Sequence, residues 1–221
     1  MRAMILAAGR GERLRPLTDS LPKALIEVRG QSLLERHLRA MHAGGIRDVV
    51  INLGWLGATI RDRVGNGDAY GLRVDYSDEG ENVLETGGGI FRALPMLGKE
   101  PFLVVNADVY TDMPFAEHVL PADAVGHLVL VDTPDYRRRG DFDLLDGVVK
   151  NAEDPTLTYS GVAIYRPEFF SNCEPGRFSI VPMLRRAADE GVLRGSHYKG
   201  LWADVGTPER LSMCNIENET E

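Results

Sequence analysis

The segment from Ala7 to Lys23 combines glycines with basic side chains in a way that suits phosphate chemistry. Gly9 and Gly11 allow the backbone to pass close to a ligand or to adopt a positive φ. Guanidinium and ammonium groups are common partners of phosphate oxygens. The segment carries four such cations within seventeen residues: Arg10, Arg13, Arg15 and Lys23. This pattern predicts a loop that holds a polyphosphate.

Two other interpretations of this segment stay open on the residues alone. Basic residues near an N-terminus often form only a solvated face. A dinucleotide-binding fingerprint would need a third glycine where this chain has Leu14, and a Walker loop would need Gly-Lys-Ser or Gly-Lys-Thr, which the segment lacks. A nicotinamide-dependent dehydrogenase is therefore disfavoured.

Two aspartates stand where they could bind a metal ion. Asp108 follows an apolar strand, and ligands of open α/β sheets bind at the carboxyl ends of the strands. Mg²⁺ prefers hard oxygen ligands and is often held by one or two carboxylates together with substrate phosphates. Asp108 could equally cap the turn that follows its strand. Asp204 follows an aromatic residue in a second short strand. The start of a helix explains the choice of Thr207, Pro208 and Glu209. It does not explain Asp204.

Three consecutive glycines, Gly87 to Gly89, stand just before a helix that we expect over residues 90–94. Glycine loses the most conformational entropy on folding, so an ordinary turn would rarely need three of them. We therefore expect a flat group to lie against this backbone. The alternative is a flexible turn in which glycine caps the helix.

The ordered motif Gly-x-Gly-x-Arg-Leu-x-Pro-Leu-Thr, followed by Pro-Lys, resembles the N-terminal motif of the sugar-1-phosphate nucleotidyltransferases. The motif Trp-x-Asp-x-Gly-Thr-Pro, from residue 202 to 208, is similar to a second motif of that family. The resemblance covers essentially the whole chain. It implies that Arg13 grips the phosphates that leave as pyrophosphate and that Lys23 lies against the phosphates near the reacting centre. It also implies that Asp108 and Asp204 bind one Mg²⁺ ion.

The resemblance also assigns residues to the two substrates. For the nucleotide it implies contacts with Ala8, Gly9, Gly11, Glu12, Arg13, Lys23, Thr86, Gly87 and Gly88. For the sugar phosphate it implies contacts with Asn106, Asp141, Glu153, Ser160 and Gly161. The chain departs from the family at three places. Many members have Thr at the position of Glu12, many have a base-reading Gln where this chain has Asn82 and Val83, and many have a Lys that is missing from the segment 153–155.

Two shorter motifs are similar to the branch of the family that acts on N-acetylmuramate 1-phosphate. They are Glu-Thr-Gly-Gly-Gly at residues 85–89 and Arg-Gly-Asp-Phe at residues 139–142. This likeness implies transfer of a uridylyl group from UTP, giving UDP-N-acetylmuramate and pyrophosphate in peptidoglycan recycling. Guanylyl or other nucleotidyl transfer to mannose, heptose or glucose 1-phosphate stays open, and so does a catalytically inactive sensor of nucleotide sugars or a regulatory subunit. The reaction needs no general base, because a phosphate monoester is already ionised near neutral pH, and we assign no catalytic role to the five histidines.

Composition limits the partners that this chain can have. The net charge of -8 argues against general binding of nucleic acid. Residues 1–40 contain eight basic and four acidic side chains, so positive charge gathers where a phosphate site is expected. The sequence has no apolar run of 18 residues and only two cysteines, Cys173 and Cys214, which indicates a cytoplasmic protein without a membrane span, a disulfide or a zinc site. We expect a monomer or a homodimer.

Hydrophobic patterns predict an α/β fold of the Rossmann-like type, a three-layer sandwich with a mainly parallel central sheet. We expect one domain over residues 1–221, with a nucleotide-binding half at 1–112 and a sugar-phosphate-binding half with antiparallel strands at 113–221. The strands are expected at 4–6, 49–51, 72–76, 102–105, 127–131, 142–145, 148–149 and 158–165. Helices are expected from Leu33 to Met41, at 55–64 and at 90–94.

Overall fold

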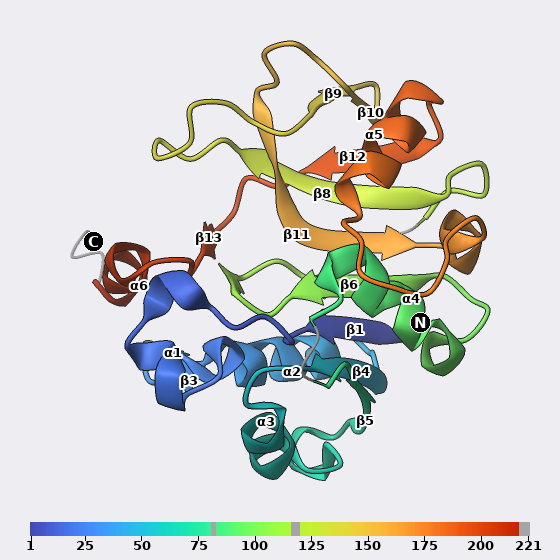
Figure 1. Ribbon diagram of the computed structural model, residues 1–221. Coiled ribbons are helices and arrows are strands. Elements are labelled where there is room, and N and C mark those ends of the chain that lie inside the picture. Colours follow the sequence, from blue (N-terminus) through green and yellow to red (C-terminus); the bar gives the residue numbers. More distant parts are fainter. Residues whose placement is uncertain (81–82, 116–119, 217–221) are drawn as a thin grey trace.

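The computed structural model describes residues 1–80, 83–115 and 120–216. A nine-stranded sheet crosses the whole molecule, with strand order β5-β4-β1-β6-β11-β8-β12-β10-β9 (Figure 1). Its strands are β1 (Ala3–Leu6), β4 (Asp48–Leu53), β5 (Arg73–Asp78), β6 (Phe102–Asn106), β8 (Gly126–Asp132), β9 (Asp143–Leu145), β10 (Val148–Lys150), β11 (Leu157–Tyr165) and β12 (Leu193–His197). Two-stranded sheets join β2 (Glu27–Val28) to β3 (Gln31–Ser32) and β7 (Val109–Thr111) to β13 (Trp202–Asp204).

The direction of the strands changes along the sheet as the sequence predicts. The strands β5, β4, β1 and β6 are all parallel to one another. The strand β11 then pairs antiparallel with both β6 and β8, and β9 and β10 form the expected hairpin around Asp146-Gly147. The antiparallel strands extend the central sheet and do not form a separate one. One sheet therefore carries both the expected nucleotide half and the expected sugar half.

Helices cover both faces of this sheet, which confirms the three layers (Figure 1). The α-helices are α1 (Leu17–Ser20), α2 (Leu33–Ala43), α3 (Gly57–Val64), α4 (Glu85–Leu97), α5 (Val181–Asp189) and α6 (Pro208–Asn215). The 3-10 helices are η1 (Glu12–Leu14), η2 (Lys23–Leu25), η3 (Asp68–Tyr70) and η5 (Pro167–Phe170). Among the described residues, no helix has the length and apolar character needed to cross a membrane.

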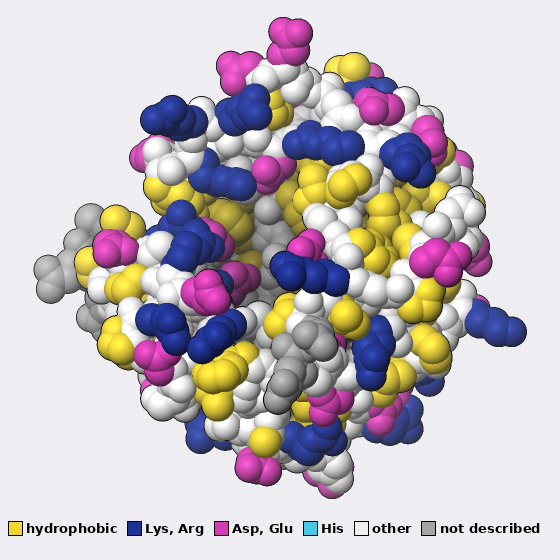
Figure 2. Space-filling model, in the orientation of Figure 1, with side chains coloured by type: hydrophobic (Ala, Val, Ile, Leu, Met, Phe, Trp, Pro, Cys, Tyr) yellow, Lys and Arg dark blue, Asp and Glu magenta, His cyan; other side chains and the backbone are white. Residues whose placement is uncertain are grey.

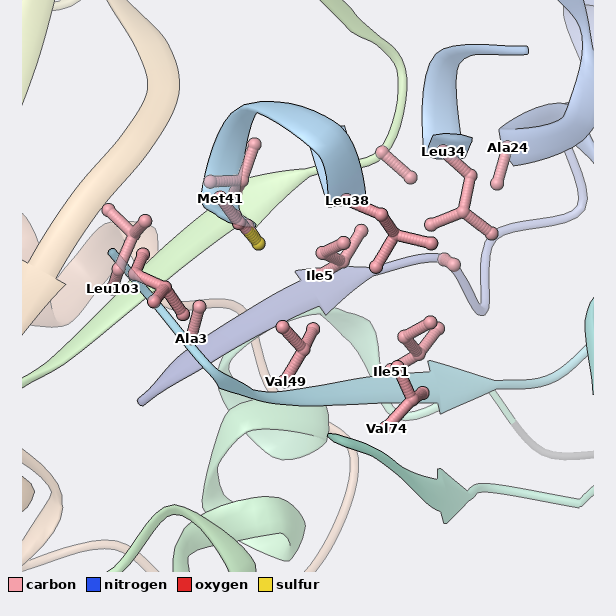
Figure 3. Close-up of a cluster of buried hydrophobic side chains, with 14 of the residues drawn as sticks. Ala3, Ile5, Ala24, Leu34, Leu38, Met41, Val49, Ile51, Val74 and Leu103 are labelled. Carbon is pink, nitrogen blue, oxygen red and sulfur yellow. The ribbon is translucent and has the colours of Figure 1, made fainter. Parts of the chain in front are cut away.

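The core beneath α2 shows why the N-terminal strands form where the sequence predicts them. Ser32 caps α2, because its hydroxyl accepts a hydrogen bond from the Glu35 amide at 3.2 Å. The buried face of α2 then packs on β1 and β4, where Ile5 and Ile51 are fully buried (Figure 3). Successive residues of a strand face opposite sides, so Met4 packs in the core on the other face of the sheet, beside α4.

Two helices begin at other residues than the sequence predicts. The helix α3 begins at Gly57 and not at residue 55, because Leu56 adopts a left-handed conformation with φ of 53°. The helix α4 begins at Glu85, so the three glycines lie in its first turns and not in a loop before it. The expected position of Gly87 and Gly88 in a nucleobase-contacting loop is therefore wrong.

The close approach of another segment of the chain explains the glycines of α4. A Cβ atom on Gly87 would lie 2.5 Å from the Phe178 ring, and one on Gly88 would lie 2.2 Å from the carbonyl oxygen of Gly176. The Gly88 amide also donates a hydrogen bond to the Phe178 carbonyl at 3.1 Å. The flat group that we expected against this backbone is therefore the protein itself, in the form of the segment 176–178.

His37 lies on the buried face of α2 with 1% of its surface exposed. Burial lowers the pKa of this imidazole to about 4, against the opposing attraction of the Asp108 carboxylate. The ring is therefore neutral near pH 7.

We expect Gly88→Ala to destabilise the protein by about 1 to 3 kcal/mol, because the added methyl group would overlap the backbone of the segment 176–178. In an unconstrained helix the same substitution would stabilise by up to ~1 kcal/mol. Urea unfolding of Gly9→Ala provides the control, since a Cβ at Gly9 meets no atom within 4 Å. A Gly88→Ala protein as stable as the wild type would contradict the close packing of α4.

The buried His37 also predicts a pH dependence of stability. Its folded pKa of about 4 lies below the usual 6.5, so the unfolded chain binds the extra proton first as the pH falls. The free energy of unfolding should then decrease between about pH 6.5 and 4, by up to ~3 kcal/mol. His37→Gln should lose this part of the pH dependence when unfolding is measured in urea at pH 7.5 and 5. An unchanged difference between the two pH values would mean that His37 does not titrate in this way.

Candidate active site

The ends of three parallel strands meet at one edge of the sheet. Leu6, the last residue of β1, stands opposite Asn52 of β4 on one side and Asn106 of β6 on the other. The Asn52 side chain accepts a hydrogen bond from the Ala7 amide at 2.6 Å, which fixes the start of the loop after β1. Asn106 and this loop therefore lie side by side, as predicted for a site at the carboxyl ends of the strands.

The two glycines of the loop after β1 serve different purposes. Gly11 has a φ of 68°, and a Cβ there would lie 3.0 Å from the Thr18 side chain and 3.1 Å from Lys23. It is therefore required by the fold of the chain. Gly9 is exposed, and a Cβ there would meet no atom within 4 Å. Its backbone is accessible, so each glycine matches one of the two expected roles: a positive φ at Gly11 and an open backbone at Gly9.

A cavity of about 440 Å³ lies against this edge of the sheet. Figure 2 shows a hollow between the lower and upper halves of the molecule, with both basic and acidic side chains on its rim. The residues that line the cavity are Leu6, Ala7, Ala8, Gly9, Gly11, Glu12, Arg13, Lys23, Ala24, Asn52, Glu79, Val83, Glu85, Thr86, Asn106, Ala107, Asp108 and Gly206. The cavity thus brings together most of the predicted nucleotide residues, without Gly87 and Gly88. Asn82, the predicted neighbour of the base, lies outside the described residues.

Lys23 and Asp108 form an ion pair at the wall of the cavity. Their side chains are 16% and 27% exposed, so solvent screens the pair only in part. Asp108 lies two residues after the end of β6 and Lys23 begins η2, so two segments 85 residues apart supply the pair. Both charges therefore lie where the sequence places the reacting phosphates.

Pairing of β13 with β7 brings the second aspartate to the same place. Asp204 stands opposite Val109, the residue that follows Asp108, and the Val205 amide donates a hydrogen bond to the Asp108 carbonyl at 2.8 Å. The predicted convergence of the two aspartates is therefore present in the backbone. Gly206, which lines the cavity, lies beside Asp204, and a Cβ on it would come within 3.1 Å of the Arg13 guanidinium.

Two residues that the sequence analysis did not single out hold the Asp204 carboxylate. Arg210, on α6, donates a hydrogen bond to Oδ2 at 2.5 Å, and the Tyr136 hydroxyl donates one to Oδ1. Burial and the bond to Asp204 both raise the pKa of Tyr136, so its phenol stays protonated and remains a donor. Arg210 stands three residues after the helix cap Thr207, a spacing that could have drawn attention to it.

A buried polar pair at the floor of the cavity was also missed. Glu79 is only 7% exposed, and its carboxylate accepts hydrogen bonds from the Asn52 side chain at 2.6 Å and from the Leu84 amide at 2.8 Å. A buried carboxylate is tolerated when such bonds satisfy it. The pair connects the loop after β1 with the start of α4. Asn52 could have been found as a polar residue inside an apolar strand.

The predicted sugar-phosphate residues divide into two groups. Asn106 lines the cavity. The structure also describes Asp141, Glu153, Ser160 and Gly161, and these four residues do not line it. The Asp141 carboxylate is bound within its own half of the protein, by the Arg137 side chain at 2.9 Å and the Tyr159 amide at 3.0 Å. Glu153 lies in an exposed turn.

The predicted contact of Ser160 with a sugar is not supported by its position. Its side chain is 1% exposed, and its hydroxyl donates to the Val129 carbonyl at 2.7 Å. Gly161 packs under the site, where a Cβ would lie 2.6 Å from the Asn106 amide nitrogen. The Ser160 carbonyl accepts a hydrogen bond from the Trp202 indole at 2.9 Å, so this bulge of β11 supports both Asn106 and β13.

The arrangement of Asp108 and Asp204 suits a divalent cation. Carboxylate oxygens are hard ligands, and two of them, completed by water and substrate phosphates, form a usual site for Mg²⁺. Within the described part of the chain, no group of three or more His, Cys, Asp or Glu side chains could enclose an ion by itself. A cation here would therefore complete its coordination with water or with oxygens of a substrate.

Comparisons with known proteins identify the family of this chain. A family model described as nucleotidyl transferase matches residues 2–221. The chain is 47% identical to the N-acetylmuramate alpha-1-phosphate uridylyltransferase of Neisseria meningitidis serogroup B, over 96% of this chain and 95% of that protein. It is 37% identical to the protein of the same name from Caulobacter vibrioides, over 94% and 92%.

A solved structure supports the fold independently of sequence. The crystal structure of a proposed glucose-1-phosphate thymidylyltransferase from Bacillus anthracis, in complex with sucrose, superimposes with a TM-score of 0.87 at 20% identity, covering 97% of this chain and 94% of that chain. At this identity the likeness concerns the fold alone. Together with the match of the family model along residues 2–221, the sequence relatives show that this chain belongs to the nucleotidyl transferase family.

Proposed function

We propose that this protein transfers a uridylyl group from UTP to N-acetylmuramate α-1-phosphate, giving UDP-N-acetylmuramate and pyrophosphate in peptidoglycan recycling. The observation that carries the proposal is the backbone pairing that brings Asp204 next to Asp108, at a cavity lined by Asp108, Lys23 and the glycine loop. Two relatives named for this reaction cover nearly the whole chain, which supports the choice of substrates.

Asp108 and Asp204 would hold one Mg²⁺ ion between them, with the remaining ligands supplied by water and the phosphates of UTP. When bound, this cation supplies positive charge that neutralises and orients the phosphate oxygens. Lys23 forms an ion pair with Asp108, so its ammonium group would lie close to the phosphates of UTP. Arg13, exposed beside Gly206, would hold the phosphates that depart as pyrophosphate.

The reaction joins two anions, and the protein lowers its barrier by reducing repulsion and fixing geometry. An oxygen of the sugar 1-phosphate attacks the α-phosphorus of UTP in line. The bond between that phosphorus and the bridging oxygen to the β-phosphate breaks, and pyrophosphate leaves with the electron pair. No proton has to be removed from the attacking oxygen, because a phosphate monoester is ionised at neutral pH.

The nucleotide would lie along the loop after β1, against Ala8, Gly9 and Gly11, with its base toward Thr86 at the start of α4. Glu79 and Asn52 would keep these two segments at a fixed separation. The sugar phosphate would contact Asn106 at the end of β6. Asp141, which lies on the sugar half, would contact the sugar through Oδ1, since the bonds from Arg137 and from the Tyr159 amide both go to Oδ2.

We expect Asp108→Asn and Asp204→Asn each to lower kcat by at least about a hundredfold in Mg²⁺, because each removes a charge that orients the cation at the reacting phosphates. Continuous detection of pyrophosphate measures this rate. Asp75→Asn is the matched control, since Asp75 is an exposed carboxylate on β5 and outside the residues that line the cavity. Turnover at the wild-type rate in either site variant would refute the assignment of the two aspartates.

The choice of substrates is tested by the same assay over a panel of nucleotides and sugar phosphates. We expect UTP with N-acetylmuramate 1-phosphate to give the highest kcat/KM. Preference for GTP with mannose or heptose 1-phosphate would assign the chain to another activity of the family. Failure to release pyrophosphate with every pair would indicate a protein that binds nucleotide sugars without catalysis.

A further inference from the structure

Tyr136, Asp204 and Arg210 form one closed group of side chains beside the cavity, called here the Asp204 cluster. The Tyr136 hydroxyl donates to Oδ1 of Asp204, and the Arg210 guanidinium donates to Oδ2 at 2.5 Å. The guanidinium carbon of Arg210 also lies 3.7 Å from the centre of the Tyr136 ring. Both oxygens of Asp204 are therefore engaged by protein donors.

The three members of the cluster come from different parts of the chain. Asp204 ends β13, Arg210 lies on α6, and Tyr136 belongs to the segment 133–141 that connects β8 with β9, on the same side of the molecule as β13 (Figure 1). Arg137 ties the far end of this segment to Asp141 and Thr158, at 2.9 and 3.3 Å. The bond from Tyr136 to Asp204 thus joins the sugar half to the residues around the cavity.

A divalent cation at Asp204 would compete with the two donors of the cluster, because each carboxylate oxygen already accepts a hydrogen bond and a cation repels the positively polarised hydrogen of that donor. The bond from Arg210 is a charge-assisted one, made by a side chain that is 20% exposed and fixed on a helix. The bond from Tyr136 is made by a neutral hydroxyl on a side chain that is 46% exposed, in a segment without helix or strand. The cation should therefore displace Tyr136 and leave Arg210 in place.

We propose that Tyr136 is a positioning residue that holds the segment 133–141 against Asp204 until a divalent cation takes Oδ1 of that carboxylate. Metal binding then releases the segment on the side where the sugar phosphate enters. This inference rests on the proposed function to the extent that Asp204 is a metal ligand.

Trypsin provides a direct readout that does not depend on catalysis, because the segment contains the exposed residues Arg137, Arg138 and Arg139. Cleavage there is followed by mass spectrometry in EDTA and in excess Mn²⁺ or Mg²⁺. Cleavage after Lys99, an exposed residue between α4 and β6, is the internal reference. Cleavage of a segment that opens and closes quickly reports the population of its open form.

We expect the metal to accelerate cleavage at 137–139 in the wild type by about tenfold. This factor corresponds to the free energy that is lost with one hydrogen bond to a charged group. Tyr136→Phe should be cleaved at the fast rate already in EDTA and should not respond to metal. Tyr198→Phe is the matched control, because the Tyr198 hydroxyl likewise bonds a carboxylate, that of Asp112, outside the Asp204 cluster. It should behave as the wild type does.

Binding of Mn²⁺ is measured by the loss of the free-ion signal in electron paramagnetic resonance. It tests whether the metal site exists, separately from the release of the segment 133–141. Tyr136→Phe should bind Mn²⁺ about three- to tenfold more tightly than the wild type, because the competing donor is gone. Mn²⁺ that binds without changing cleavage at 137–139, or a Tyr136→Phe protein as resistant as the wild type in EDTA, would overturn the proposal. Absence of any Asp204-dependent Mn²⁺ binding would instead remove the metal site on which both proposals rest.

Discussion

Antiparallel pairing of β13 with β7 is the interaction on which the candidate site depends. It places Asp204 opposite Val109 and hence beside Asp108, although the two aspartates are far apart in the sequence. The indole of Trp202 donates a hydrogen bond to the Ser160 carbonyl at 2.9 Å, and the Thr111 hydroxyl donates one to the Leu201 carbonyl at 2.7 Å, so the start of β13 is fixed. A short pair of strands thus determines the position of both carboxylates.

Like charges held together repel, and the repulsion grows where water is excluded. In this protein Lys23 offsets the charge of Asp108, and Arg210 offsets that of Asp204. The folded chain therefore pairs each of the two carboxylates with a basic side chain. A cation would take over part of this neutralisation and leave Lys23 and Arg210 near the phosphates.

The sequence predicted the fold well, and also the position of Asp108 at the carboxyl end of a buried strand, because both depend on local patterns. Apolar runs such as Val49–Ile51 and Phe102–Val105 identify buried strands, and parallel strands bring their carboxyl ends to one edge. Contacts between segments that are far apart in the sequence could not be predicted from such local patterns. Gly87 and Gly88 are needed because the segment 176–178 crosses α4, and no pattern near residue 87 contains that information. Tyr136 and Arg210 were missed for the same reason, since only the folded chain brings them to Asp204.

The most direct measurement is the structure of the protein crystallised with Mn²⁺ and a non-reacting analogue of UTP, with the metal located by its anomalous scattering. The account predicts one ion that contacts oxygens of both Asp108 and Asp204 and also a phosphate of the analogue. An ion bound by only one of these carboxylates, or triphosphate held away from Lys23 and the loop after β1, would contradict it.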